Sequence, residues 1–449
     1  MSLSGDVGVI LSLFCPDDKG FGTWQECLLK EGDGFFRGHG YSYIGVFLLG
    51  YRVIYVIRND ESEDVFLVGF SERIGFGAPV DFIYSKTEGV IWDSEFPRGD
   101  WKSGIPDLSF LFSKCGESSE KYSQIVFLVR DHQNFAHVLL NSYTAISRVI
   151  PVSPKVAGAV FIGKKFPLGR VDEFFPEIKE LKRSEVFIKV SDNFFFSSQL
   201  AIPLLVGSKN GRKSLKIPSK DFEGRIVNVK SRLGMDTAFF NIREQVDKSK
   251  SPVVWVSIRG YGKRNASNFE DFVVFFLSSL RASLGNGFTV IFDGLSLQEG
   301  FSNEESVRGG PDIKSQIKKE NVVADSIIAK MACFEGIEFI SLIGLPIVNV
   351  MSIARYADFY LCHDGSIQHK IGWLYPETPG IIHGNSQRNV GKEHGWHPVD
   401  IGSGPCWLPN KFVIDENEIG GNVPHANYGY KVKFGKDLAE YIKNAHDFF

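Results

Sequence analysis

The sequence is poor in sulfur. Its 449 residues include four methionines and six cysteines, and no two cysteines form a CxxC pair. Scattered cysteines are typical of reduced thiols and argue against a disulfide framework. We therefore expect a chain that folds around a hydrophobic core in a reducing compartment such as the cytoplasm.

A long hydrophobic run is also missing. The opening segment, MSLSGDVGVILSLFCPDDKG, holds an apolar run of about nine residues, whereas a membrane-spanning helix needs about 20. The run has no basic flank, and we interpret it as a first strand. The sequence thus predicts a soluble cytoplasmic protein, and it leaves peripheral association with the inner face of a membrane open.

An excess of charge of either sign is missing as well. Fifty lysines and arginines stand against 53 aspartates and glutamates, which gives a formal net charge of −3. No overall field favours nucleic acid or an anionic membrane, so a site for an anion must be built locally. The hydrophobic content of 43% is that of an ordinary globular chain, long enough for about two or three domains.

Short alternating segments dominate residues 1–115, and they include YSYIGVFLL, YRVIYVIRN and EDVFLVGFS. Apolar and polar residues that alternate in this way predict a β-rich region. Over residues 116–248 the pattern changes to a buried strand, QIVFLV, a polar turn, RDHQNF, and a helix, AHVLLNSYTAISRVI. This order is typical of a parallel sheet with crossover helices, and further strands are expected at GAVFIG, EVFIKV and LAIPLLVG.

Residues 249–386 show the clearest alternation of strands and helices. Strands are expected at VVWVSI, FTVIFDG, IEFISLIG, FYLCHDG and PGIIHG, and helices at NFEDFVVFFLSSLRASLG, VVADSIIAKMACFEG, PIVNVMSIARYAD and SIQHKIGWLYP. Residues 387–449 are expected to form a loop-rich C-terminal extension that closes with the helix LAEYIKNAHDFF. We therefore predict an α/β fold with two Rossmann-like domains, 116–248 and 249–386, facing across a cleft.

The turn in DHQNFAHVLLN is a candidate for proton transfer. Asp131 and His137 follow a predicted parallel strand at its carboxyl end, where ligands of such sheets usually bind. A histidine there can take a proton from a hydroxyl near neutral pH. The alternative is that His137 packs against the apolar side of the helix.

A second candidate is the loop SIRGYGKRNASNFED, which carries Arg259, Lys263 and Arg264. Guanidinium groups contact phosphate oxygens in pairs, and the amides at the start of the next helix favour an anion. The alternative is a solvated basic turn. Asp293 in VIFDG also follows a strand, where it can accept hydrogen bonds from a ribose or sugar, or anchor the loop before glycine.

A third candidate is the histidine-rich stretch DFYLCHDGSIQHKIGWLYPETPGIIHGNS. The spacing of His363, Asp364 and His369 matches no strong zinc pattern, and Ser366 lacks the flanking glycines of a hydrolase nucleophile. The remaining interpretation is a strand that ends at HDG, followed by a helix that Ser366 caps. Free amides at such a helix start suit an anion.

Three motifs together resemble the family 61 glycosyltransferases, over about residues 125–385. NFAHVLLN is similar to the family's N-F/Y-x-H-W-L-L segment; it matches Asn134, Phe135, His137 and Leu139, with Val138 in the tryptophan position. SIRGYGKRNASNFE is similar to the family's paired arginines and Asn-Glu; Arg259, Arg264 and Asn268 match, and Phe269 displaces Glu270. CHDGSIQH occupies the place of H-G-A-G-L-T-N; His363 matches, and Asp364 and Ser366 replace glycines.

The resemblance implies a two-Rossmann (GT-B) transferase that inverts the anomeric carbon and needs neither a bound metal nor another cofactor. It implies that residues 249–386 bind a nucleotide-sugar donor and that residues 116–248 face the acceptor, a saccharide or glycolipid. His137 or Asp131 is the expected base. The expected donor contacts are Arg259, Arg264, Asn268, Asp293, His363, Asp364, Gly365, Ser366 and His369.

The type implied is a bacterial enzyme of surface polysaccharide biosynthesis, building capsule, exopolysaccharide or lipopolysaccharide. Arginines and helix starts would replace a metal ion in stabilising the departing nucleotide. Two alternatives stay open: another GT-B transferase of the fucosyl or Kdo type, and a polysaccharide-binding or assembly protein that keeps the fold without catalysis.

Overall fold

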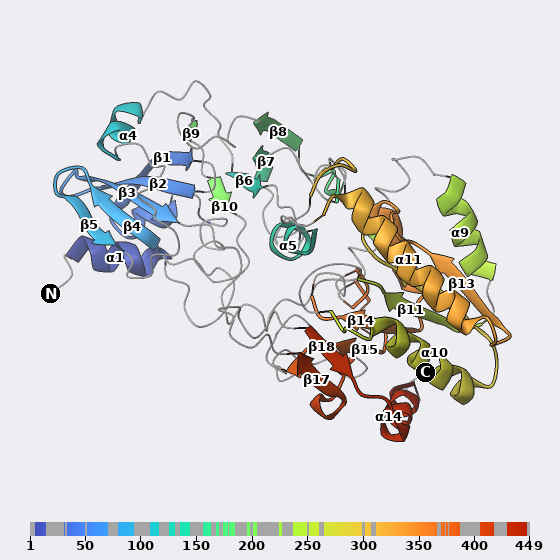
Figure 1. Ribbon diagram of the computed structural model, residues 1–449. Coiled ribbons are helices and arrows are strands. Elements are labelled where there is room, and N and C mark those ends of the chain that lie inside the picture. Colours follow the sequence, from blue (N-terminus) through green and yellow to red (C-terminus); the bar gives the residue numbers. More distant parts are fainter. Residues whose placement is uncertain are drawn as a thin grey trace. The chain divides into compact units, whose positions relative to one another are not determined.

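A computed structural model shows the fold (Figure 1). It describes residues 5–14, 31, 34–49, 52–70, 80–93, 108–115, 125–130, 135–143, 156–162, 168–169, 174–177, 179–184, 195–197, 201–203, 224–226, 237–248, 251–259, 265–298, 301–306, 311–365, 370–372, 374–375, 377–386, 405–416 and 429–446. The chain divides into two compact units. The N-terminal unit comprises residues 1–132, 137–166 and 170–215, and the C-terminal unit comprises 133–136, 167–169 and 216–449.

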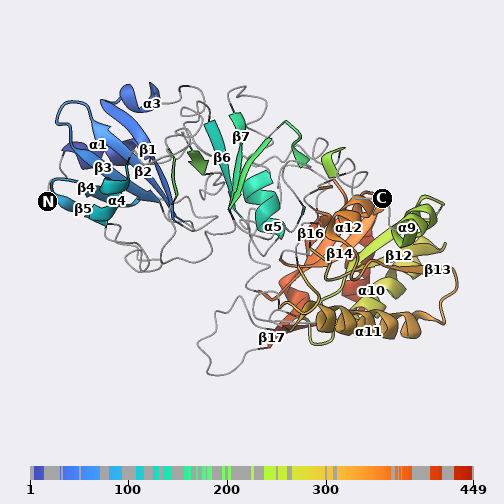
Figure 2. The same ribbon diagram turned by 90° about the horizontal axis from the view of Figure 1, so that it is seen from above.

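The N-terminal unit begins with an antiparallel sheet, whose strands before residue 100 are blue in Figure 2. Its strands, in the order β5-β4-β3-β2-β1-β9, are β1 (Tyr41–Leu49), β2 (Arg52–Asn59), β3 (Val65–Phe70), β4 (Val80–Ser85), β5 (Gly89–Asp93) and β9 (Phe195–Ser197). Alternate side chains of the strands, among them Ile54 and Val56, pack against Leu111 of α4 (Leu108–Lys114). The β-rich pattern of the sequence is therefore confirmed as a sheet with two packed faces.

The segment expected as a first strand is instead the helix α1 (Gly5–Phe14), so that prediction is wrong. Its buried side chains are Val7, Ile10, Leu13 and Phe14, which recur at helical spacing. Phe14 stacks on Tyr55 of β2, with ring centroids 5.5 Å apart. A short apolar run does not reveal its period by hydrophobicity alone, which is why the sequence misled. The short helix α3 (Gly34–Arg37) covers the same face through Phe36.

A second sheet of the N-terminal unit is parallel in all its described pairings. Its order is β10-β6-β7-β8, with β6 (Ile125–Arg130), β7 (Val156–Ile162), β8 (Lys179–Ser184) and β10 (Ala201–Pro203). The helix α5 (Phe135–His137) and the π-helical turn η1 (Val138–Tyr143) follow β6, which confirms the predicted strand and the first part of the predicted helix. The rest of that helix, residues 144–150, lies outside the described residues. The strand expected at EVFIKV lies outside the described residues.

The C-terminal unit is built on a parallel sheet of order β13-β12-β11-β14-β15-β16. The strands are β11 (Val253–Ser257), β12 (Phe288–Asp293), β13 (Ile337–Ser341), β14 (Phe359–His363), β15 (Gly380–His383) and β16 (Cys406–Trp407). Counted along the chain this is the order 3-2-1-4-5-6 of a dinucleotide-binding fold.

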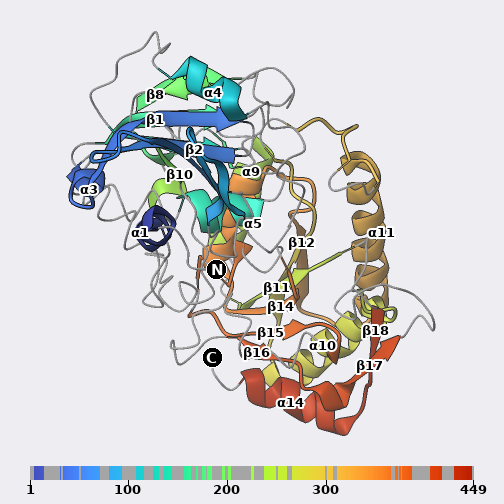
Figure 3. The ribbon, with the colours of Figure 1, turned by 90° about the vertical axis from the view of Figure 1, so that its left-hand side faces the viewer.

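Helices cover both faces of this sheet (Figure 3). On one face α10 (Phe269–Leu284), α11 (Ile313–Met331) and α14 (Lys436–His446) pack against Val254 and Val256. On the other face α9 (Thr237–Lys248), α12 (Ile347–Ile353) and the adjoining turn η5 (Ala354–Tyr356) pack against Val253 and Trp255. Strands covered on both sides are buried along their whole length and therefore mostly apolar, as Val253–Val256 of β11 are. The predicted α/β class with two Rossmann-like parallel sheets is confirmed.

A C-terminal hairpin completes this unit. It consists of β17 (Val413–Glu416), which follows the short turn η7 (Asn410–Phe412), and β18 (Gly429–Val432), which is antiparallel to β17. We use the name C-terminal hairpin for β17 and β18 throughout.

Some elements cross the boundaries expected from the sequence. Strand β9, beyond residue 115, pairs with β1. Helix α9, before residue 249, packs on the C-terminal unit through Val246. Strand β16 and helix α14, beyond residue 386, belong to the sheet and core of the same unit. The sequence indicates most of these elements, but not which sheet or core receives them.

The helix expected at SIQHKIGWLYP is not formed where the structure describes that segment. The described residues between 370 and 378 lie in turns and a single 3-10 position. By its place in the sequence Pro376 opposes the last turn of the expected helix, because proline lacks an amide donor and restricts the residue before it. Among the described helices, none has the length and apolar character needed to cross a membrane.

Candidate functional site

The point where the strand order of the C-terminal sheet reverses lies between β11 and β14. Successive strands are added outward from β11 on one side and from β14 on the other, and ligands of such sheets bind in the crevice at the carboxyl ends of these two strands. Ser257 and Cys362 end up side by side there, with Oγ and Sγ 2.9 Å apart. Arg259 therefore follows β11 at the edge where Asp364 follows β14.

Arg259 is the half-buried cation of this edge. Its charge acts on two buried neighbours. It contributes, after burial and His383, to the lowered pKa of His363. It opposes the rise in the pKa of Tyr430 that burial and Asp364 cause. The structure therefore brings together Arg259, His363 and Asp364, three of the predicted donor contacts.

Two histidines lie beneath Arg259, packed ring against ring. His363 ends β14 and His383 ends β15, both are buried, and their ring centroids are 4.2 Å apart. Phe269 covers both rings, at 5.0 and 5.9 Å. Burial lowers the pKa of His383 to about 3 and the pKa of His363 well below its ordinary value. Both imidazoles are therefore neutral near pH 7, so they can offer hydrogen bonds to an anion but no charge.

The hydroxyl of Tyr430, from β18, lies between these histidines. It is 2.5 Å from Nδ1 of His383 and 3.4 Å from Nδ1 of His363. Within the part of the chain that the structure describes, the Nε2 atoms of both histidines have no hydrogen-bond partner. Tyr430 therefore fixes one side of each ring and leaves the other nitrogen for a partner outside the cluster.

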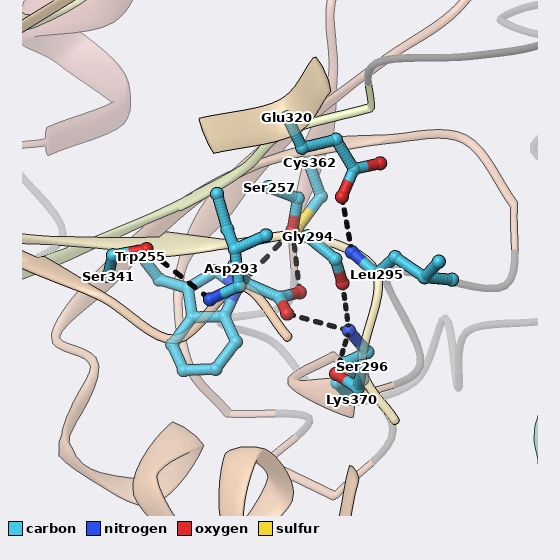
Figure 4. Close-up of polar contacts among 11 residues, drawn as sticks. Trp255, Ser257, Asp293, Gly294, Leu295, Ser296, Glu320, Ser341, Cys362 and Lys370 are labelled. Atoms are coloured by element: carbon cyan, nitrogen blue, oxygen red, sulfur yellow. Dashed lines mark hydrogen bonds and ion pairs between the residues drawn. The ribbon is translucent and has the colours of Figure 1, made fainter. Parts of the chain in front are cut away.

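Asp293 is engaged inside the protein. Its carboxylate is fully buried and lies 2.6 Å from Nζ of Lys370, which also donates to the carbonyl of Gly294 and to Oγ of Ser296 (Figure 4). Ser257 donates a longer bond of 3.4 Å to the other carboxylate oxygen. Burial raises the pKa of Asp293, and the ammonium of Lys370 opposes the rise. This geometry fits the loop-anchoring alternative of the sequence better than a contact with ribose.

Asn268 is likewise engaged, with the C-terminal hairpin. Its Nδ2 donates to the carbonyl of Val432 at 2.8 Å, and its Oδ1 accepts from the amide of Val432 at 3.0 Å. The helix α10 that begins beside it carries Glu270 and Asp271 in its first turn, and Lys330 pairs with both at 3.2 and 2.9 Å. These carboxylates already stand at the positive end of the helix, so the start of α10 suits an anion less well than the sequence predicts.

The remaining predicted residues divide into two groups. Gly365 is described, and its φ of +129° is a conformation that side chains rarely adopt. A Cβ added there would meet nothing within 4 Å, so the chain is open beside it. Asp131, Arg264, Ser366 and His369 lie outside the described residues and stay predictions.

His137 lies at the end of α5, immediately before the π-helical turn η1. Only its backbone is described. π-Helical turns are rare and are frequent at functional sites, which is consistent with the role expected of this segment. Its role as base stays a prediction.

Sequence reasoning gave no role to Lys370, Tyr430 or His383. His383 had a visible signal, because it ends a strand next to the central pair. Lys370 and Tyr430 had none, because each meets its partner across at least 47 residues of chain. Among the described residues, no group of three or more histidines, cysteines or carboxylates could hold a metal ion.

Comparison with known proteins gives a fold likeness and no family. No protein-family model and no curated protein matches the chain. Among solved structures it is similar to a glycosyl transferase of family 9 from Veillonella parvula, with a TM-score of 0.34, 10% identity, and coverage of 64% of this chain and 86% of that one.

It is also similar to the UDP-GlcNAc 2-epimerase of Methanocaldococcus jannaschii. The TM-score is 0.30 at 11% identity, over 72% of this chain and 99% of that one. For the structure of that epimerase in complex with UDP-GlcNAc and UDP, the TM-score is 0.28 at 12% identity, over 73% of this chain and 100% of that one. At scores this low, the function of the chain has to be argued from its own residues.

Proposed function

We propose that this chain is a glycosyltransferase that binds the nucleotide of a nucleotide-sugar donor in its C-terminal unit. The observation that carries the proposal is the position of Arg259. It is a half-buried cation at the carboxyl end of β11, beside the reversal of a sheet of order 3-2-1-4-5-6. The net charge of −3 offers no general attraction for an anion, so such a local arrangement is what a phosphate group requires.

The residues that follow β11 and β14 suit different parts of a nucleotide. The guanidinium of Arg259, with that of Arg264 from the same loop, would take the phosphate charge. The neutral imidazoles below could add a hydrogen bond through Nε2 of His363. Asp364 is a carboxylate, which repels phosphate but accepts hydrogen bonds from hydroxyl groups, so we assign it to a ribose or sugar.

The transfer step follows from these charges. The acceptor hydroxyl attacks the anomeric carbon while His137, or Asp131, takes its proton. The bond between that carbon and the phosphate oxygen breaks, and the nucleotide leaves with the electron pair. The arginines stabilise the negative charge that develops on the leaving group, so the proposal includes no metal ion. A single displacement of this kind inverts the anomeric carbon.

The finer assignment comes from the three motifs that resemble family 61. It makes the acceptor a saccharide or glycolipid and the pathway surface polysaccharide biosynthesis in a bacterial cytoplasm, and it leaves peripheral association with the inner face of the membrane open. The motifs favour this assignment over a fucosyl- or Kdo-type transferase, and the nucleotide that binds distinguishes between them.

The first experiment measures nucleotide binding by calorimetry with UDP, GDP and CMP. We expect Arg259→Ala and Arg264→Ala each to weaken the binding by roughly ten- to a hundredfold, because a hydrogen bond to a charged group contributes about 1.5–3 kcal/mol. Arg281→Ala is the matched control. That arginine lies in the last turn of α10 and donates to the carbonyls of Gly285 and Glu335. If all three variants bind like the wild type, the phosphate assignment is wrong.

The second experiment separates transfer from binding. With the nucleotide identified, His137→Asn should lower turnover roughly a hundredfold or more and leave nucleotide affinity nearly unchanged, as expected for a general base. Full turnover in this variant would rule out His137. Tight nucleotide binding by the wild type, with no transfer or hydrolysis of any donor, would favour the non-catalytic alternative.

A further inference from the structure

The C-terminal hairpin contacts the chain at the ends of three strands of the C-terminal sheet, close to the proposed nucleotide site. It bonds to residues 265–268 after β11, to His363 of β14 and to His383 of β15. Strand β17 adds a contact beyond β15, where Asp415 accepts hydrogen bonds from the amide and hydroxyl of Ser386. The hairpin thus joins both sides of the point where the strand order reverses.

The main chain of β18 holds the segment that follows the basic loop. The amide of Ser267 donates to the carbonyl of Tyr430 at 2.8 Å, and the amide of Tyr430 donates to the carbonyl of Asn265 at 3.2 Å. These bonds make a parallel bridge between Ala266 and Tyr430. Beyond this bridge, the side chain of Asn268 makes its two hydrogen bonds to the main chain of Val432, further along β18. Strand β18 therefore holds residues 265–268 by contacts like those between neighbouring strands of a sheet.

This segment is connected to Arg259 by a side chain. Nδ2 of Asn265 donates to the carbonyl of Arg259 at 3.3 Å. On the other side of the site, the phenol of Tyr430 bonds to Nδ1 of His383, which stacks against His363. One tyrosine therefore connects by its main chain to the arginine segment and by its side chain to the histidine pair.

We propose that Tyr430 is a positioning residue for the nucleotide site, and that the C-terminal hairpin sets the place of Arg259 relative to His363. The proposal rests on the proposed function, since it concerns the same site. Its main chain would act on Arg259 through residues 265–268, and its hydroxyl would act on His383 and His363; neither would touch the nucleotide. A cation that is already in place when the phosphate arrives binds it more tightly than one that must be ordered.

The test compares two tyrosines that each lose one hydroxyl. Tyr430→Phe removes the bond to His383 and the longer bond to His363, and it leaves the main-chain bonds of Tyr430 intact. Tyr441→Phe, in α14, removes a bond of 3.0 Å to the carbonyl of Trp407, away from the site. We expect Tyr430→Phe to weaken binding of the best nucleotide among UDP, GDP and CMP by roughly three- to tenfold, the usual range for one neutral hydrogen bond. Tyr441→Phe should leave the affinity unchanged even where it lowers the melting temperature equally.

A double-variant cycle shows whether the effect passes through Arg259. In an Arg259→Ala background, Tyr430→Phe should weaken binding by much less than in the wild type, because coupled residues are not additive. If the fold-losses of nucleotide affinity in the two single variants multiply in the double variant, the positioning role is wrong. If Tyr430→Phe fails to fold, Asn268→Ala takes its place in the cycle, with the same expectation.

Hydrogen exchange without nucleotide distinguishes failure of this inference from failure of the proposed function. Tyr430→Phe should speed amide exchange at residues 257–259 and 265–268, whereas Tyr441→Phe should not. Unchanged exchange at these residues in Tyr430→Phe would overturn the inference, whatever the protein binds. If the wild type binds none of the three nucleotides, the proposed function fails, and the exchange result still decides whether the hairpin positions Arg259.

Discussion

At the scale of single residues, burial decides which polar groups at the carboxyl edge can carry charge. The buried Asp293 keeps a partner in Lys370, and the two buried histidines lose their protons. Arg259 is only half-buried, and an arginine stays charged at any pH of interest. The sequence displayed Arg259, Asp293 and the two histidines at strand ends, but it could not show which of them face one another or that Lys370 meets Asp293.

The ion pair of Lys370 and Asp293 is predicted to serve stability. Lys370→Met should lower the free energy of unfolding by about 3–5 kcal/mol, because it leaves a buried carboxylate without its charged partner. The double variant Asp293→Asn with Lys370→Met should recover much of this loss in urea denaturation. If Lys370→Met is as stable as the wild type yet loses nucleotide binding, Lys370 belongs to the site instead.

The two buried histidines predict a loss of stability in acid. In the unfolded chain a histidine takes up a proton near its ordinary pKa of 6.5, whereas folded His383 does so only at about 3. Between these two pKa values the unfolded state binds more protons than the folded state. The free energy of unfolding should therefore fall as the pH falls below about 6.5, by about 1.4 kcal/mol per pH unit for each such histidine.

The check compares urea denaturation of the wild type and His383→Gln at about pH 7, 6 and 5. The variant should be less stable at neutral pH, and its free energy of unfolding should fall less on acidification. Its change in free energy of unfolding per pH unit should be smaller by about 1.4 kcal/mol, the contribution of one histidine. Equal slopes would mean that His383 can take up its proton in the folded state.

At the scale of elements, the alternation of strands and helices over residues 251–363 could be predicted because each element carries its own signal. The strand VVWVS is apolar up to its last residue, and α10 shows a helical period and is capped by Gly285, whose φ is +67°. The errors fell where the local signal was short or mixed. The run in α1 could be either type, and the segment around Pro376 combined apolar spacing with a proline that opposes a helix.

Gly8 tests the corrected assignment of α1. It is exposed, and a Cβ added there would meet nothing within 4 Å. In a helix, Gly8→Ala should raise the free energy of unfolding by about 0.5–1 kcal/mol, and Gly8→Val should raise it less. In a strand the order would reverse, because β-branched residues are favoured there. Urea denaturation of the two variants decides between these outcomes.

At the scale of the whole molecule, the candidate site is assembled from segments far apart in the chain. Arg259, His363, His383 and Tyr430 come from three strand ends and a hairpin, over more than 170 residues (430 − 259 = 171). Parallel strands bring their carboxyl ends to one edge, so the first three could be expected together from the pattern alone. Tyr430 could not, because nothing in its own segment indicates that β18 lies against residues 265–268.

The central claim is that a nucleotide binds where the strand order of the C-terminal sheet reverses. Hydrogen exchange of the wild-type chain, with and without the best nucleotide among UDP, GDP and CMP, tests it most directly. The account predicts slower exchange of the amides at residues 257–259 and 363–365 when the nucleotide is present. Protection confined to other parts of the described chain, with these residues unchanged, would contradict it.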